Sequence, residues 1–200
     1  GTDSCRKICI LASLAFGKHV YPDEVYTQGI KNISLEDIEY ARSFGSAIKL
    51  IGMARQISQD KIYALVSPAI VKNSSQLARV EDVFNAILVR SDATGDVVFY
   101  GKGAGKMPTA SAVVADVIDC AKHTVTKKLF GWNDSSPNYV EDYTLMKTSL
   151  YVRGKTEDKS KASKEVSKLF GDIILLARNE AFENEIAFIN DPRATYGRKR

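Results

Sequence analysis

Two charged residues near the start of the chain, Asp3 and Lys7, have a spacing suited to joint chemistry. Residues four apart lie on one face of a helix, where a carboxylate and an ammonium group can meet. A free lysine titrates at about 10.4, so a lysine base needs desolvation or a nearby cation to lower its pKa. On spacing alone, an exposed ion pair worth roughly 0.2–0.5 kcal/mol is the favoured interpretation.

A second candidate is the glycine-rich stretch in which Gly101, Gly103 and Gly105 occupy alternate positions. It follows the strand-like residues 97–100 and precedes Pro108, which suits the first turn of a helix. Glycines allow positive φ and close backbone approach, and a helix start attracts anions or polar ligand groups. The spacing is neither G-x-G-x-x-G nor a P-loop, so a tight strand-to-helix turn is an equally good interpretation.

Cysteine and histidine residues are few and do not form a ligand pattern. The chain has three cysteines, Cys5, Cys9 and Cys120. Cys5 and Cys9 could share a metal, but two thiols without histidine support favour core packing. His19 and His123 lie in separate segments. We therefore expect no metal site, and the sparse thiols indicate a reducing, cytoplasmic setting.

The composition is that of an ordinary globular protein. Of 200 residues, 44% are hydrophobic and 26% are charged, and the net charge of +4 is mild. The basic residues are scattered, which argues against a nucleic-acid partner. No run of about 18 apolar residues occurs, so we expect no membrane span.

Hydrophobic periodicity predicts an α+β fold with a mixed or antiparallel open sheet covered by helices. Ser34 and Asp37 form a capping-box pattern at the start of the second helix. The helices expected in this part are 3–17, 35–44 and 108–121. The expected strands are 47–57, 61–71, 85–90 and 96–100.

The composition changes at residues 129–142, where Gly, Asn, Asp, Ser and Pro gather. We interpret this stretch as a linker that is exposed and open to proteases. It would separate a domain over 1–128 from a module over 143–200. That module is expected to have a β-α-β-β order, with strands 145–152, 173–177 and 185–189 and a helix over 160–170.

Four stretches, in order, resemble one enzyme family. Residues 100–116, YGKGAGKMPTASAVVAD, are similar to the glycine loop and following helix of homoserine dehydrogenases. Residues 3–12, 29–38 and 48–52 are similar to that family's catalytic helix and next segments. The resemblance covers residues 3 to about 123.

The resemblance implies an enzyme that interconverts L-homoserine and L-aspartate 4-semialdehyde with NAD or NADP, on the route to threonine, methionine and isoleucine. It implies that Lys7 is the general base and that Asp3 binds the substrate amino group. The alternative is a Lys7 that stays charged and polarises the substrate oxygen while the proton passes through water. Gly103, Ala104 and Gly105 would lie against the nicotinamide. Gln28 stands where the family pattern leads us to expect a glutamate.

The resemblance also implies a domain organisation. The module over 143–200 looks like a partial ACT-type regulatory domain, because 190–200 is too short for a second helix and a fourth strand. The 1–128 domain would be N-terminally incomplete, without the nucleotide-binding domain that grips most of the cofactor. The 200 residues alone would then be inactive, and the enzyme would be a homodimer. The alternative is a non-catalytic amino-acid-sensing or oligomerisation module.

Overall fold

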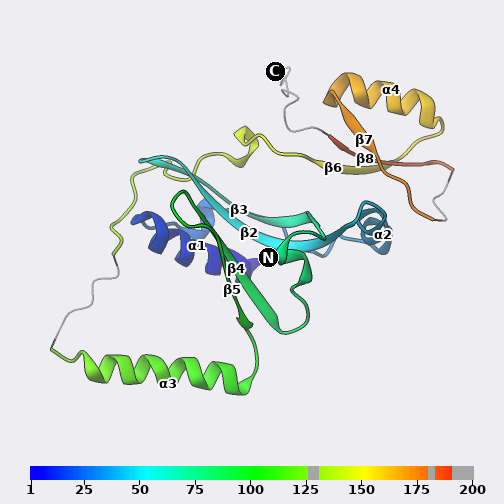
Figure 1. The fold of residues 1–200 in the computed structure, drawn as a ribbon. Coiled ribbons are helices and arrows are strands. Elements are labelled where there is room, and N and C mark those ends of the chain that lie inside the picture. The colour runs from blue at the N-terminus through cyan, green and yellow to red at the C-terminus, as the bar shows by residue number, and fades with distance from the viewer. Residues whose placement is uncertain (126–130, 180–182, 191–200) are drawn as a thin grey trace. The chain divides into compact units, whose positions relative to one another are not determined.

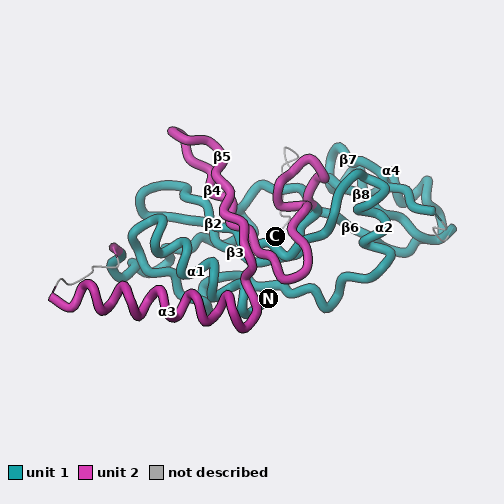
Figure 2. Tube along the Cα trace, turned by 60° about the horizontal axis from the view of Figure 1, so that its bottom comes forward, with its two compact units in different colours: residues 1–70, 132–200 teal, residues 71–131 magenta. Residues whose placement is uncertain are grey.

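The computed structural model describes residues 1–125, 131–179 and 183–190 (Figure 1). The predicted α+β class is confirmed, because helices accompany three open sheets. The chain divides into two compact units, which are described separately. The first comprises Gly1–Ile70 and Trp132–Arg200, and the second comprises Val71–Gly131 (Figure 2).

The first unit begins with helix α1, Thr2–Phe16, which ends at Gly17 in the left-handed conformation, with φ 72°. Its buried face is formed by Cys5, Cys9, Ala12 and Ser13, so the interpretation of the two cysteines as core residues is confirmed. Burial and the neighbouring Cys5 raise the pKa of the Cys9 thiol to about 12. The Cys9 thiol is therefore a protonated packing group at neutral pH.

The first sheet has the strand order β1-β3-β2. Its strands are β1, Tyr26–Thr27, β2, Ser46–Ser58, and β3, Lys61–Lys72. Strand β1 is parallel to β3, which makes the sheet mixed as predicted. Helix α1 and helix α2, Leu35–Ser43, both pack on β2. At Gly52 a Cβ would lie 3.2 Å from the Cβ of Ile8, so glycine permits the close approach of α1.

Residues 132–141 are held more firmly than their composition predicts. Asn133 exchanges backbone hydrogen bonds with Gly17 and His19, and Ile62 does so with Tyr139 and Glu141. Tyr139 is 1% exposed and belongs to the same core cluster as the α1 cysteines. Residues 131–138 are mostly exposed, as we expected from their polar composition, but main-chain pairing at Asn133 and the buried side chain of Tyr139 anchor the stretch.

The C-terminal part of the first unit has the predicted order of strand, helix, strand, strand. These elements are β6, Tyr151–Lys155, α4, Lys159–Phe170, β7, Ile173–Leu175, and β8, Glu185–Asn190. The sheet order is β6-β8-β7, with antiparallel pairs. Helix α4 packs on one face, where Phe170 contacts Phe188. Residues 191–200, which we expected to be too short to complete the module, lie outside the described residues.

The predicted strand over 145–152 is wrong at its start. Tyr143–Leu145 forms a 3₁₀ turn, and strand pairing begins only at Tyr151, opposite Ile189. Along the described residues, the ladder between β6 and β8 runs from Tyr151 opposite Ile189 to Lys155 opposite Glu185.

The second unit contains a 3₁₀ turn at Gln76–Arg79, strands β4, Phe84–Ser91, and β5, Gly95–Lys102, and helix α3, Lys106–Lys122. The predicted hairpin is present, but it forms its own two-stranded sheet instead of extending the first one. Several large apolar side chains of β5 and α3 are exposed, including Phe99 at 61% and Val117 at 61%.

Candidate functional site

The predicted pair Asp3 and Lys7 is brought together by helix α1. The Nζ of Lys7 lies 2.8 Å from Oδ2 of Asp3, and the two side chains are 55% and 81% exposed, in that order. The opposite, buried face of α1 fixes this orientation, because Cys5 and Cys9 are seated in the core. Lysine and carboxylate are therefore presented side by side to an incoming molecule.

The start of α1 lies against the segment that contains Gln28. A Cβ on Gly29 would lie 3.1 Å from the backbone N of Gly1, and one on Gly1 would lie 2.8 Å from Cγ2 of Thr27. The Gln28 N–H donates to the carbonyl of Val66, which ties this segment to strand β3. The residue that departs from the expected glutamate is therefore next to the helix that carries Asp3.

The glycine loop belongs to the second unit, and the chain's own geometry accounts for two of its glycines. A Cβ on Gly103 would lie 2.1 Å from Nδ2 of Asn85, and the Gly103 N–H donates to the carbonyl of Val83. Gly105 precedes α3 with φ 120° and ψ 153°, a region essentially reserved for glycine. A Cβ on Gly101 would meet no atom within 4 Å.

The loop has the features that a nicotinamide cofactor needs for close approach. Residues 101–105 are exposed, and Ala104 adds only a methyl group between Gly103 and Gly105. Helix α3 begins directly after them, and its first-turn N–H groups favour polar or anionic ligand groups. The loop is therefore an exposed strand-to-helix turn whose backbone a ligand could approach closely.

The part of the chain that comprises residues 1–125, 131–179 and 183–190 holds no group of three His, Cys, Asp or Glu side chains arranged for a metal ion. Nor does it contain a helix with the length and apolar character needed to cross a bilayer. His19 contacts the ring of Tyr21, with a centroid distance of 4.2 Å.

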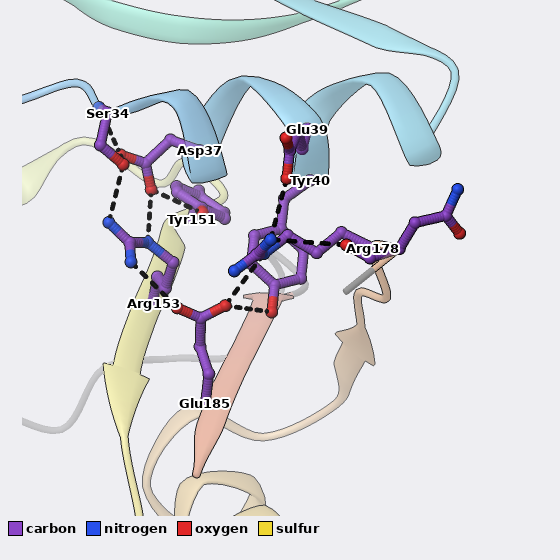
Figure 3. A network of polar contacts seen from close by, with 9 residues as sticks. Ser34, Asp37, Glu39, Tyr40, Tyr151, Arg153, Arg178 and Glu185 are labelled. Atoms are coloured by element: carbon purple, nitrogen blue, oxygen red, sulfur yellow. Dashed lines mark hydrogen bonds and ion pairs between the residues drawn. The ribbon is translucent and has the colours of Figure 1, made fainter. Parts of the chain in front are cut away.

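Sequence reasoning missed a buried polar network between α2 and the β6-β8-β7 sheet (Figure 3). Arg153 of β6 donates to Oδ1 of Asp37 at 2.7 Å, to Oγ of Ser34 at 3.0 Å and to Oε2 of Glu185 at 3.1 Å. The hydroxyl of Tyr151 also donates to Asp37, at 2.8 Å. An arginine within a short strand was the available signal, since an inward arginine requires buried acceptors.

The second half of the network is centred on Glu185. Its carboxylate accepts from the hydroxyl of Tyr40 at 2.8 Å and from Nε of Arg178 at 3.1 Å. Nη1 of Arg178 also donates to Glu39 at 2.9 Å. The donors thus come from α2, from β6 and from the residues after β7.

Both carboxylates are held in the charged form. Burial opposes the ionisation of Asp37, but hydrogen bonds from Arg153, Ser34 and Tyr151 outweigh it and keep the pKa of Asp37 below its ordinary value. Burial opposes the ionisation of Glu185 in the same way, and hydrogen bonds from Tyr40, Arg178 and Arg153 leave its pKa lowered.

Comparison with known proteins identifies the family. The family model described as homoserine dehydrogenase matches residues 1–118. The homoserine dehydrogenase of Helicobacter pylori is 33% identical over 198 residues, which are 98% of this chain and 46% of that protein. The homoserine dehydrogenase of Neisseria gonorrhoeae is 43% identical over 122 residues, 61% of this chain and 28% of that protein.

Solved structures of the same family agree. The crystal structure of S. aureus homoserine dehydrogenase at pH 6.0 has a TM-score of 0.73 and 30% identity, covering 95% of this chain and 47% of that one. The structure from Thiobacillus denitrificans has a TM-score of 0.74 and 28% identity, covering 94% and 45%. The chain thus spans about half the length of these relatives. With more than half of its residues matched by the family model, the chain belongs to the homoserine dehydrogenase family.

Proposed function

We propose that this chain is the catalytic part of an NAD(P)-dependent oxidoreductase that interconverts L-homoserine and L-aspartate 4-semialdehyde. The observation that carries the proposal is the exposed Asp3–Lys7 pair on α1, in a chain that belongs to the homoserine dehydrogenase family. Such an enzyme would serve threonine, methionine and isoleucine biosynthesis in the cytoplasm.

The two side chains would divide the work on homoserine. The carboxylate of Asp3 would bind the substrate ammonium, which frees Lys7 from its ion pair. The Lys7 amine would then face the substrate hydroxyl, whose proton must leave as hydride leaves the same carbon and the C=O bond forms. Lys7 takes that proton itself, or it remains charged and polarises the oxygen while water takes the proton.

The loop of Gly103, Ala104 and Gly105 would lie against the nicotinamide end of NAD or NADP, which supplies the hydride acceptor. Its exposed backbone and the adjacent start of α3 support this role. We also propose the domain organisation expected from the sequence, with the catalytic and dimerisation domain over 1–128. A connecting segment over 129–142 would lead to an ACT-like module over 143–200, and the enzyme would act as a homodimer.

The test is steady-state kinetics on the full-length protein that contains this chain. The parent protein should reduce NAD or NADP only when homoserine is added. Lys7→Ala should lower kcat by about 10²–10⁴, the usual range for an acid–base group. Asp3→Asn should raise the KM for homoserine and leave the KM for the cofactor unchanged, because its proposed contact is with the substrate alone.

Arg6→Ala provides the matched control, since it removes a charge from an exposed neighbour on the same helix. It should leave kcat close to that of the parent. If Lys7→Ala also keeps the parental kcat, Lys7 is a surface lysine and its proposed role is wrong. If the parent protein shows no homoserine-dependent reduction, the proposed activity itself is wrong.

A further inference from the structure

The polar network in Figure 3 joins the C-terminal sheet to the start of helix α2 at one point. Ser34 precedes the first turn of α2, and the carboxylate of Asp37 accepts from the Ser34 N–H at 2.9 Å, as the predicted capping box requires. The guanidinium of Arg153 contacts both members of this cap. Arg153, together with Tyr151 of the same strand, thus holds the N-terminus of a helix more than a hundred positions earlier in the sequence.

The burial of these groups makes the attachment stiff. The Asp37 and Glu185 side chains are 8% and 4% exposed, and Arg153 between them is 28% exposed. Removing one partner would leave a buried carboxylate without its charge partner, which costs more than losing an ordinary surface pair. Within the described residues, every buried side-chain nitrogen or oxygen has a hydrogen-bond partner.

The α2 cap is connected to helix α1 by a short segment. Residues 30–33 form a turn in which the Ile33 N–H donates to the Ile30 carbonyl, and Gly29 lies against the backbone of Gly1. The Gly1 carbonyl in turn accepts from the Cys5 N–H, which closes the first turn of α1 around Asp3. Both helices rest on β2, and the 28–33 segment links their first turns.

We propose that Arg153 is a positioning residue for the substrate site. It acts through the Ser34–Asp37 cap and the 28–33 segment to fix the first turn of α1, and hence Asp3. The proposal rests on the proposed function, because it assigns Asp3 to the substrate ammonium. It predicts an effect on homoserine binding that is not shared by the cofactor.

The experiment compares Arg153→Met, Arg153→Lys and Lys155→Met in the full-length protein. Lys155 is two residues further along β6, is exposed and serves as the matched control. Arg153→Met should raise the KM for homoserine about tenfold, within the range of coupling energies between connected sites. In Arg153→Met the KM for the cofactor should remain within about twofold of the parent value. In Lys155→Met the KM for homoserine and the KM for the cofactor should both remain within about twofold of the parent values. Arg153→Lys keeps the charge but not the fork of donors, and should fall between these limits.

A folded Arg153→Met protein with the parental KM for homoserine would overturn the proposal, as would equal increases in the KM of both substrates. If Arg153→Met does not fold, Ser34→Ala decides the matter. It removes one Arg153 contact from the cap and should raise the KM for homoserine to a smaller extent. An unchanged KM in that variant would overturn the proposal.

Amide hydrogen exchange separates this inference from the proposed function. Arg153→Met, but not Lys155→Met, should speed exchange in residues 1–7 and 28–38. If the parent protein lacks homoserine-dependent activity, the functional proposal is lost, yet the exchange data still report on the connection. Unchanged exchange in residues 1–7 would show that the cap is not coupled to α1.

Discussion

At the scale of single residues, the three loop glycines are present for different reasons. Gly105 has a backbone conformation that side chains rarely adopt, whereas Gly103 avoids the side chain of Asn85. Gly101 has open space where a Cβ would be. A pattern of alternate glycines therefore contains one position fixed by backbone strain, one by packing and one by neither.

This difference predicts the outcome of two alanine substitutions. Gly105→Ala should lower the free energy of unfolding by about 1–3 kcal/mol, the cost of holding a non-glycine residue in that region. Gly101→Ala, the matched control within strand β5, should leave stability unchanged or slightly higher. Urea denaturation of both variants is the measurement. Equal stabilities would show that Gly105 does not have this conformation in solution.

The candidate site residues were predictable because each is recognised from its spacing to near neighbours in the sequence. Asp3 and Lys7 are four apart in a short helix, and the glycines alternate within a strand-to-helix connection. The requirement for glycine at position 103, however, comes from Asn85, whose side chain would clash with a Cβ there. That contact exists only once the hairpin has folded. Sequence alone could thus name the residues but not say which of them the fold itself requires.

At the scale of elements, α2 joins two sheets. It packs on β2, and its polar side chains contact the face of the C-terminal sheet that carries Arg153 and Glu185. Phe188, three residues after Glu185, points to the alternate face, where α4 lies. The three-stranded C-terminal sheet is therefore covered by α2 on one face and by α4 on the other. The sequence had predicted only the helix within the module, α4, as its cover.

This arrangement predicts acid sensitivity. The pKa values of Asp37 and Glu185 are lowered on folding, so their contribution to stability is complete above the ordinary carboxyl pKa of about 4. It is lost as the pH falls below that value and through the lower folded pKa values. Urea denaturation between neutral pH and about pH 3 should show this loss, and Asp37→Asn should reduce its size.

The exposed pair of Arg90 and Asp96 provides the control for that experiment. Asp96 also has a lowered pKa, chiefly from its hydrogen bond to Arg90, but both side chains are largely in solvent. Salt screens exposed pairs far more than buried ones. At high salt Asp96→Asn should therefore leave the pH dependence of stability intact. If Asp37→Asn has equally little effect, the buried network does not stabilise the fold through charge.

Element positions followed from periodicity, but their ends and partners did not. Strand β6 begins at Tyr151 and not at 145, where residues 143–145 form a 3₁₀ turn. Asp37 was expected as a helix cap, and its second role emerges only from Arg153, 116 positions away. Likewise, the polar composition of residues 131–138 did not indicate that Tyr139, which follows them, is buried and anchors the stretch. Contacts between distant segments leave no periodic pattern in either segment, so they could not be predicted from one stretch of sequence alone.

At the scale of the whole molecule, exposed apolar side chains predict self-association. Strands β4 and β5 expose Val89 at 44% and Phe99 at 61%, and an uncovered apolar sheet face usually meets a partner. We expect a dimer formed through the strands of residues 47–100, since symmetric dimers are the commonest assembly. Light scattering at tens of micromolar should give twice the monomer mass. A folded protein with a monomer mass at that concentration would contradict this expectation.

The division of the first unit into two separate stretches of chain has a consequence for synthesis on the ribosome. Segment 71–131 is synthesised before the second stretch of the first unit, so the first unit cannot be complete when this segment emerges. Asp37 must wait for Arg153, 116 residues later, which at about 5–20 residues per second takes roughly 6–23 s. During that interval the nascent chain presents α2 and the 1–70 core without the cover that Tyr139 and the C-terminal sheet later provide. Residues 1–70 therefore complete their buried contacts only after strand β8, which carries Glu185, has been synthesised.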